Sequence, residues 1–342
     1  MQFASDNTAP VHPRVMDAIM AANDGPAMPY GEDELTQRAE ALLRDTFGAA
    51  DALIVTTGTV ANALALSALV PPFGGVICHR EAHIQTDECG APEFFTSGAK
   101  LLLADGPEGR LMPEAIDGVM AGFVHGIHQV KPAAVSITNA TEMGGIYTPA
   151  EVAAVADGAH AHGLRLHMDG ARLANALVAT GVPARAMTAE AGVDILSFGL
   201  TKTGAMLAEA VLVFDATLAG EFGRRRKRAG QLVSKMRFLA AQFIALLEDD
   251  LWLELAAHAN AMAARLAAGL KAHAGVLLAH EVRGNTIFAW LPKALHERLR
   301  EAGAVYYVWR DEGERLLVRF VTSWATRPEE VEALLKVLAR TR

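Results

Sequence analysis

The stretch LRLHMDGARLANALVATG, residues 164–181, decides the fold class of this chain. Its first part is apolar and has the character of a buried strand, and an Ala- and Leu-rich segment with helical spacing follows directly. The same alternation recurs: strand-like segments occupy 52–56, 76–78, 100–104, 133–138, 164–169, 194–198 and 210–214, and helical segments occupy 59–70, 149–163 and 171–181. Strands that alternate with such helices predict an α/β fold with a mainly parallel, seven-stranded sheet flanked by helices.

The pattern changes after about residue 230, where a long helical stretch over 231–275 leads into short strand-like segments at 285–291 and 315–324. We expect a smaller C-terminal α/β domain here, joined to the large domain by one long helix. The predicted division places the large, ligand-binding domain at 1–247 and the small domain at 248–342. A chain of 342 residues is long enough for two such cores.

Composition narrows the classes of function. The formal net charge of −8 argues against nucleic acid as the main partner, because phosphate backbones attract basic surfaces. No apolar run approaches the length of a membrane span, and the opening residues MQFASDNTAP lack the regions of a signal peptide. Only Cys78 and Cys89 are present, without the spacing of a metal site. We therefore expect a cytoplasmic protein that binds neither membrane nor metal.

Ligands of parallel sheets bind outside the carboxyl ends of the strands, so the residues at those ends are the first candidates. In TTGTVANALAL, residues 56–66, a strand passes into a helix through Gly58. Gly58 allows the backbone to approach a ligand closely, and Thr57 and Thr59 can cap the helix. A helix start of this kind suits a phosphate, and an ordinary capped helix explains it equally well.

HMDGAR, residues 167–172, places Asp169 at the end of an apolar strand. A carboxylate in such a place needs a partner, because an unpaired buried charge is costly or becomes neutral. Two partners are open: the start of the next helix, or the cation of a ligand. Arg172 is suited to clamp a carboxylate, since its planar fork binds two oxygens at once.

Lys202 lies in SFGLTKTGAM, residues 197–206, among small and apolar residues just after a buried strand. Apolar surroundings lower the pKa of a lysine and free its neutral amine to attack carbonyls, whereas a structural lysine would bond loop carbonyls. Together with Gly58 and Asp169, Lys202 completes the three anchors of pyridoxal 5′-phosphate. These are a phosphate cradle, a partner for the pyridinium nitrogen and a lysine that binds the cofactor covalently.

The chain resembles the low-specificity L-threonine aldolases, which belong to the β-eliminating lyase group of fold-type I pyridoxal-phosphate enzymes. The matching pieces run nearly end to end: ASDN (4–7), YGED (30–33), TGTVAN (57–62), EAHIQTDECGAPEFF (81–95), HMDGARLANA (167–176), SFGLTKTGAM (197–206) and VRFVTSW (318–324). The combination of HMDGAR with TK is the specific part. The resemblance implies an aspartate-aminotransferase-like fold and the cleavage of L-threonine, L-allo-threonine and related β-hydroxy-α-amino acids to glycine and an aldehyde.

At matching positions, the resemblance implies that Lys202 holds the cofactor and that Asp169 pairs with its pyridinium nitrogen. Gly58 and Thr59 match the phosphate loop. Thr201, beside the lysine, stands where many relatives carry serine. The groups that hold the substrate carboxylate match Ser5, Arg172 and Arg319.

His83 matches the residue that stacks on the cofactor ring, and its spacing to Glu88 matches the family's His and Glu, although a histidine in an acidic loop is common. We expect His83 to be the base for the β-hydroxyl proton, directly or through a water that Glu88 or Glu142 orients. Glu142 stands where many relatives carry a histidine that bears on recognition of the β-hydroxyl. This departure predicts weak discrimination between threonine and allo-threonine.

The family also implies an assembly. Its members are tetramers in which a neighbouring subunit adds basic residues near the phosphate. We therefore expect a homotetramer with shared active sites, to which Lys235 and Arg237, or the basic run 223–228, contribute. Tyr30 matches an aromatic neighbour of the substrate.

Two other functions stay open. Another fold-type I enzyme, such as a β-eliminating lyase or an aminotransferase, would release pyruvate and ammonia, or a keto acid, in place of glycine and an aldehyde. A non-catalytic metal-binding protein would use cysteines and histidines, of which the candidates are Cys78, His79, His83, His125 and His128. No carboxylate completes a zinc pattern among them.

Overall fold

The fold is built around a large sheet in this computed structural model, which describes residues 1–340. Its strands are β1 (Asp51–Val55), β2 (Gly74–His79), β3 (Lys100–Ala104), β4 (Lys131–Thr138), β5 (Arg165–Gly170), β6 (Ile195–Gly199) and β7 (Glu209–Val213). They lie in the order β1-β7-β6-β5-β4-β2-β3, and only β7 runs antiparallel to its neighbours. The predicted mainly parallel, seven-stranded sheet is confirmed. Six carboxyl ends therefore meet at one edge, together with the amino end of β7.

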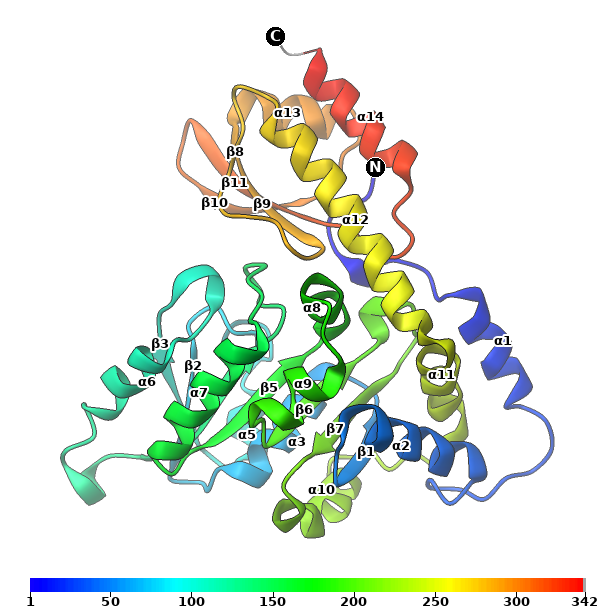
Figure 1. The fold of residues 1–342 in the computed structure, drawn as a ribbon, viewed down its shortest axis with the longest axis vertical. Coiled ribbons are helices and arrows are strands. Elements are labelled where there is room, and N and C mark those ends of the chain that lie inside the picture. Colours follow the sequence, from blue (N-terminus) through cyan, green and yellow to red (C-terminus); the bar gives the residue numbers. More distant parts are fainter. Residues whose placement is uncertain (341–342) are drawn as a thin grey trace.

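Helices cover both faces of the large sheet (Figure 1). The helices of this part of the chain are α1 (Pro13–Ala21), α2 (Glu34–Phe47), α3 (Gly58–Leu69), α4 (His83–Thr86), α5 (Ala91–Phe95), α6 (Pro113–Met120), α7 (Pro149–Ala161), α8 (Leu173–Thr180), α9 (Ala184–Met187), α10 (Phe222–Arg228) and α11 (Arg237–Leu247), of which α1 packs on α11. Neighbouring strand residues point to opposite faces, so Leu53 packs with α3 while Ile54 packs in the core that includes α7 and α8. The helices predicted at 59–70, 149–163 and 171–181 correspond to α3, α7 and α8.

A second, antiparallel sheet forms the small domain, in the order β10-β11-β9-β8. Its elements are α12 (Leu251–Lys271), β8 (Leu277–Leu278), β9 (Thr286–Pro292), α13 (Lys293–Glu301), β10 (Tyr307–Asp311), β11 (Arg315–Val321) and α14 (Pro328–Ala339). The N-terminal segment joins this domain, since Phe3 is fully buried in its core and its backbone bonds to Val305 and Val321 at 2.8 Å. The small C-terminal domain is thus present, and the boundary between residues 247 and 248 stays a prediction.

The single long helix predicted for 231–275 is wrong, because the chain breaks between α11 and α12. Asp249 and Asp250 have φ values of 58° and 54°, in the left-handed region that Asp tolerates better than most residues. The first turns of α12 pack in the large core through Trp252, and its last turns pack in the small core through Leu266 (Figure 1). No helix within residues 1–340 combines the length and hydropathy that a bilayer crossing requires.

Candidate active site

The strand ends of the large sheet enclose a pocket. Its lining residues are Gly58, Asn62, His83, Thr138, Ala140, Glu142, Asp169, Ala171, Arg172 and Lys202. Five of these were predicted as site residues from the sequence, Gly58, His83, Asp169, Arg172 and Lys202, and Glu142 was named as one of two acids that could orient a water. They come from separate segments and meet because parallel strands deliver their carboxyl ends to the same edge.

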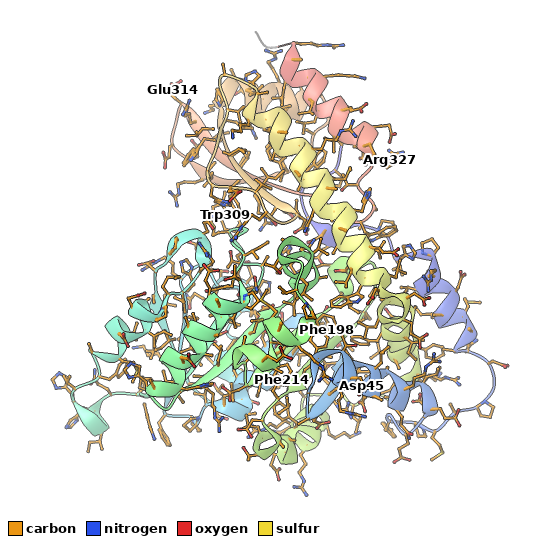
Figure 2. The ribbon with its side chains drawn as sticks, viewed as in Figure 1. Asp45, Phe198, Phe214, Trp309, Glu314 and Arg327 are labelled. Atoms are coloured by element: carbon orange, nitrogen blue, oxygen red, sulfur yellow. The ribbon has the colours of Figure 1, made fainter. Side chains whose placement is uncertain are left out.

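Lys202 reaches the pocket from a single 3-10 turn, Thr201–Thr203, directly after β6. The strand before it is anchored by Phe198 (Figure 2). The centre of the Phe198 ring lies 4.7 Å from that of Phe47 and 5.5 Å from that of Trp252. Burial, with the nearby charge of Arg172, lowers the pKa of the Lys202 amine below its ordinary value. The fraction of neutral, nucleophilic amine is therefore raised.

Asp169 ends β5 and faces Lys202 as an ionised carboxylate. Its Oδ1 accepts a hydrogen bond from Ala171 N at 2.9 Å, and its Oδ2 accepts one from Asn62 Nδ2 at 2.8 Å. Burial raises the pKa of this carboxyl, but the charge of Lys202 and these donors outweigh it, so the pKa lies below its usual value. The first turn of α8 takes no side-chain cap from Asp169. Asp169 therefore does not cap α8, and its bond from Ala171 N is the one contact it makes with the residues that lead into this helix.

The start of α3 forms the other side of the pocket. Thr57 caps this helix, with its Oγ1 accepting from Val60 N at 3.3 Å, and Gly58 and Thr59 form its first turn. Their backbone N–H groups lie at the positive end of the helix, which suits an anion. Asn62 follows one turn later and was missed as a site residue, although it belongs to the TGTVAN motif.

His83, at the start of α4, is oriented by a buried carboxylate. Its Nδ1 lies 2.8 Å from Glu88 Oε1, which also accepts from Asn62 Nδ2 at 2.7 Å. The hydrogen bond to Glu88 raises the pKa of His83 in spite of burial, while burial raises the pKa of Glu88. Asn62 thus links the His83–Glu88 pair to Asp169. The sequence suggested that Glu88 orients a water, whereas the structure shows it bonded directly to His83.

Glu142 belongs to the loop between β4 and α7, and it lines the same pocket. Its Oε1 accepts from His83 N at 2.8 Å and from Thr138 Oγ1 at 2.9 Å. Its Oε2 is buried and has no hydrogen-bond partner within residues 1–340. Burial raises the pKa of this carboxyl, and the charge of Asp169 raises it further. A buried polar atom without a partner at a pocket wall indicates a ligand contact.

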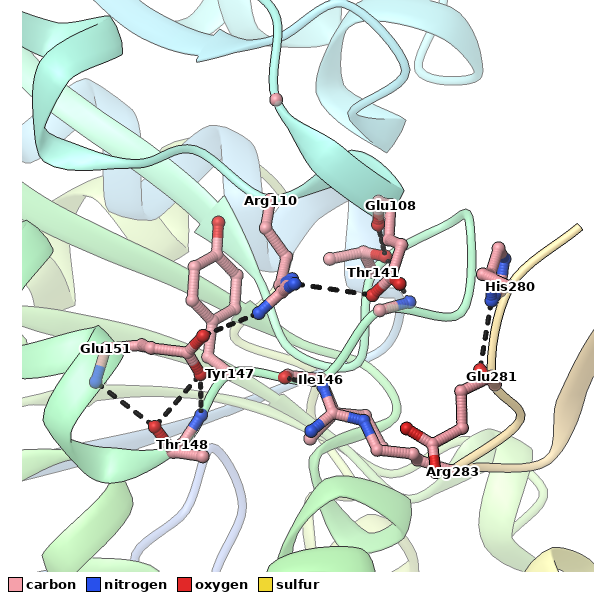
Figure 3. A network of polar contacts seen from close by, with 12 residues as sticks. Glu108, Arg110, Thr141, Ile146, Tyr147, Thr148, Glu151, His280, Glu281 and Arg283 are labelled. Carbon is pink, nitrogen blue, oxygen red and sulfur yellow. Dashed lines mark hydrogen bonds and ion pairs between the residues drawn. The ribbon is translucent and has the colours of Figure 1, made fainter.

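A polar network holds the Glu142 loop in place (Figure 3). Thr141 Oγ1 donates to Glu108 O at 2.6 Å and accepts from Gly145 N at 2.8 Å. Arg110 ties Glu108 to Glu151 on α7, at 3.4 and 2.6 Å. From the small domain, Arg283 donates to the carbonyl of Ile146, so the loop is fixed from both domains.

Arg172 is held by a residue that the sequence did not single out. Its Nε and Nη2 donate to the two carboxylate oxygens of Asp6 at 2.7 and 2.9 Å, and Asn285 Nδ2 donates to Asp6 at 3.0 Å. The ion pair is almost completely buried. Within residues 1–340, Nη1 of Arg172 makes no hydrogen bond, so this donor remains for a ligand. Ser5, the adjacent residue, accepts a bond from Asn7 N at 3.2 Å.

Arg319 stands opposite on β11 of the small domain. Its guanidinium carbon lies 5.1 Å from the ring centre of Trp309 and 5.4 Å from that of Tyr307, and Figure 2 shows Trp309 on the edge facing the large domain. Its Nε is buried and has no partner within residues 1–340. Burial lowers the pKa of Arg319, and the charge of Arg172 lowers it further. Two arginines that repel each other form a strong site for an anion.

Tyr30, Lys235 and Arg237 lie outside the pocket of their own subunit. Tyr30 is 47% exposed, its backbone N bonds to Ser234 O at 3.2 Å, and Lys227 Nζ lies 4.5 Å from its ring centre. Lys235 is exposed, and Arg237 donates to Gly25 O at 2.9 Å. Their predicted roles at a neighbouring subunit's site stay predictions. No group of three or more His, Cys, Asp or Glu in residues 1–340 is arranged to hold a metal ion.

Replacing Asp6 with asparagine is expected to lower kcat/KM about ten-fold, mainly through KM. The amide has one acceptor oxygen for three donors, Nε and Nη2 of Arg172 and Nδ2 of Asn285, so the buried Arg172 loses its orientation. The loss of one hydrogen bond to a charged group corresponds to about a ten-fold change in affinity. Steady-state kinetics on L-threonine, the substrate that the resemblance implies, measure the effect. Asp157→Asn, at an exposed position of α7, is the matched control. An unchanged KM in Asp6→Asn would show that Arg172 does not need this anchor.

The chain is similar to known proteins over almost its entire length. The model of the family described as beta-eliminating lyase matches residues 2–294. A low specificity L-threonine aldolase of Pseudomonas aeruginosa is 43% identical over 336 residues, which are 98% of this chain and 96% of that protein. One from another Pseudomonas is also 43% identical, over 97% of this chain and 95% of that protein. Among solved structures, a threonine aldolase of Leishmania major matches with a TM-score of 0.93 and 32% identity, over 99% of both chains.

Proposed function

The chain belongs to the beta-eliminating lyase family, and from this premise we infer that it is a low-specificity L-threonine aldolase that uses pyridoxal 5′-phosphate. The reaction is the cleavage of L-threonine and related β-hydroxy-α-amino acids to glycine and an aldehyde. The observation that carries this inference is the convergence of Lys202, Asp169 and the start of α3 on one pocket.

The residues of the pocket fit this cofactor. Lys202 supplies an amine of lowered pKa, and Asp169 supplies an ionised carboxylate for a protonated ring nitrogen. The start of α3 at Gly58 offers N–H groups for a phosphate. Two further buried atoms, Asn62 Oδ1 and Glu88 Oε2, have no partner within residues 1–340, which is expected of a pocket that receives a polar ligand.

When bound, pyridoxal 5′-phosphate supplies an electron sink for the bond that breaks at the substrate α-carbon. The protein supplies orientation and proton transfer. We propose that Arg172 and Arg319 bind the α-carboxylate, because both guanidinium groups have donors without a partner among residues 1–340. A fixed carboxylate and amine set the direction of the Cα–Cβ bond, and orientation of this kind is a large part of catalysis.

We propose that His83 takes the proton of the β-hydroxyl. Because Nδ1 is engaged by Glu88, Nε2 is the nitrogen left to accept a proton. Glu88 then stabilises the imidazolium that forms, as its effect on the pKa of His83 indicates. The same pair can return a proton to the α-carbon side of the product or to water as the aldehyde leaves.

Glu142 is expected to contact the β-hydroxyl through its open Oε2. Glu142→Ala should lower kcat/KM for L-threonine and L-allo-threonine about ten-fold, the effect of one hydrogen bond, while glycine, which has no hydroxyl, keeps its affinity. Glu142→Gln is the control, since it keeps an acceptor for His83 N. Equal losses of affinity for glycine and for threonine would instead assign Glu142 a purely structural role in its loop.

We also propose a cytoplasmic homotetramer with active sites shared between subunits. The exposure of large apolar side chains near Tyr30, with Met20 70% and Met28 60% exposed, supports an interface in this region. Lys235 and Arg237 lie close to the same surface and would reach the phosphate of a neighbouring site. Sedimentation velocity that finds a monomer at micromolar concentration would contradict this assembly.

The spectrum and products of the purified protein test the proposed function. We expect a visible absorbance band that borohydride reduction removes, and glycine release from threonine, allo-threonine and phenylserine. The expected weak discrimination gives comparable rates for threonine and allo-threonine. A protein that releases ammonia and pyruvate, or a keto acid, but no glycine would be another enzyme of this fold.

A further inference from the structure

Glu209 is a buried acid to which the reaction described above gives no role. It begins β7 and pairs with Val55 on β1 and with Gly199 on β6, at the edge of the sheet where the pocket lies. Only 7% of the residue is exposed, and burial raises the pKa of its carboxyl to about 7. A buried acid within an otherwise apolar strand is costly unless it has a specific partner.

The space around the carboxyl ties it to two functional segments. A Cβ at Gly199 would lie 2.3 Å from Glu209 Oε2, so a side chain at this position would displace the Glu209 carboxyl from the end of β6. A Cβ at Gly58 would lie 3.6 Å from the same oxygen, which is van der Waals contact. The carboxyl therefore lies between the start of α3 and the end of β6, directly behind the pocket.

Thr201 is the partner of this acid. The hydroxyl and the backbone N–H of Thr201 lower the pKa of the Glu209 carboxyl against the effect of burial, so both polar groups of Thr201 lie beside this acid. The hydroxyl oxygen also accepts from Ala208 N at 3.3 Å, and Leu200 N donates to Ala208 O at 2.8 Å. The turn that carries the lysine is thus bonded to the backbone of Ala208, and the Glu209 carboxyl lies next to it.

We propose that Glu209 is a positioning residue for Lys202: its carboxyl fixes the turn Thr201–Thr203 against the start of α3 and so holds the lysine amine in the pocket. The inference rests on the proposed function, which makes Lys202 the residue that binds the cofactor. It also assigns a role to Thr201, whose hydroxyl lies beside the Glu209 carboxyl.

Charge adds to this geometric role. The charges of Lys202 and Asp169 shift the pKa of Glu209. The charges of Arg172, Asp6, Asp169 and Glu209 shift the pKa of Lys202. Among these, an ionised Glu209 favours the positive form of the group at Lys202. Removing its charge is therefore expected to lower the pH at which that group loses its proton. A residue that only packed against the turn would leave this pH unchanged.

The test uses the holoenzymes of wild type, Glu209→Gln, Glu209→Ala and Asp194→Asn. The last is the matched control: Asp194 is a buried acid just before β6, at the opposite end from Lys202, and it bonds Arg165 and His160 at 2.7 and 2.9 Å. Two readouts are independent of turnover: the pH midpoint of the visible cofactor band, and the rate of cofactor loss on dialysis. Thermal unfolding reports the structural cost of each variant.

In Glu209→Gln we expect the midpoint to fall by about one pH unit, a ten-fold change in proton affinity, and cofactor loss to accelerate several-fold. Asp194→Asn should lower thermal stability without either change. If Glu209→Ala does not fold, Glu209→Gln still decides, because it keeps the size of the side chain. A band present in wild type and identical in Glu209→Gln, with equal cofactor retention, would overturn the positioning role. A wild type without the band would overturn the proposed function itself.

Discussion

Lys202→Ala is expected to have no visible cofactor band and to release glycine from L-threonine at least about a thousand-fold more slowly than the wild type. The reason is that, in the described part of the chain, Lys202 is the one lysine that lines the pocket, so the covalent link to the cofactor and the amine that assists its exchange are both lost. The absorbance spectrum and a glycine-release assay measure the two effects.

The matched control for this variant is Lys131→Ala, an exposed lysine at the opposite end of β4 from the pocket. It should keep both the band and the turnover. Far-ultraviolet circular dichroism establishes that Lys202→Ala is folded, so that the loss is chemical. Normal turnover by a folded Lys202→Ala protein would refute the proposed function at its foundation.

Asp169→Asn is expected to retain part of its cofactor but to turn over about a hundred-fold or more slowly. An amide cannot balance the positive charge of a protonated ring nitrogen, so the electron sink is weakened where the bond breaks. The amide also offers one acceptor where the carboxylate serves two donors, Ala171 N and Asn62 Nδ2, which leaves one buried donor unpaired.

Cofactor content and kcat separate the two consequences of Asp169→Asn. The matched substitution Asp194→Asn removes a buried carboxylate from the same sheet, far from the pocket, and should leave kcat nearly unchanged. Because the pKa of Asp169 is lowered in the fold, its ionised form contributes stability above its unfolded pKa, and this is lost as pH falls through the folded pKa. A kcat equal to that of the wild type would leave Asp169 as a structural residue only.

The sequence predicted those parts of the site that depend on position along a strand. Gly58, Asp169 and Lys202 stand at the ends of apolar segments, and the rule for parallel sheets brings such ends together. The strand and helix segments were also predictable, because apolar periodicity and Gly stops are local signals. The break at Asp249 and Asp250 was not, since two acidic residues interrupt a helical pattern without a Gly or Pro.

Residues whose role depends on a distant partner were not predictable. Asp6 pairs with Arg172, which lies 166 positions later in the chain, and no local sequence pattern around Asp6 predicts that contact. Glu209 gave a weak signal as a lone acid directly before an apolar strand, but its partner Thr201 becomes evident only when β6 and β7 are paired. The roles proposed for Lys235 and Arg237 involve a second subunit, so they stay predictions.

The way α12 is shared between the two domains has a consequence for how the protein unfolds. Its early turns belong to one core and its late turns to the other, within a single uninterrupted helix. Melting either core would leave half of this helix without its packing, and an isolated helix of that length is marginal in water. The two domains are therefore expected to unfold in one cooperative step. A substitution that destabilises the packing at either end of α12 should then lower the stability of both domains.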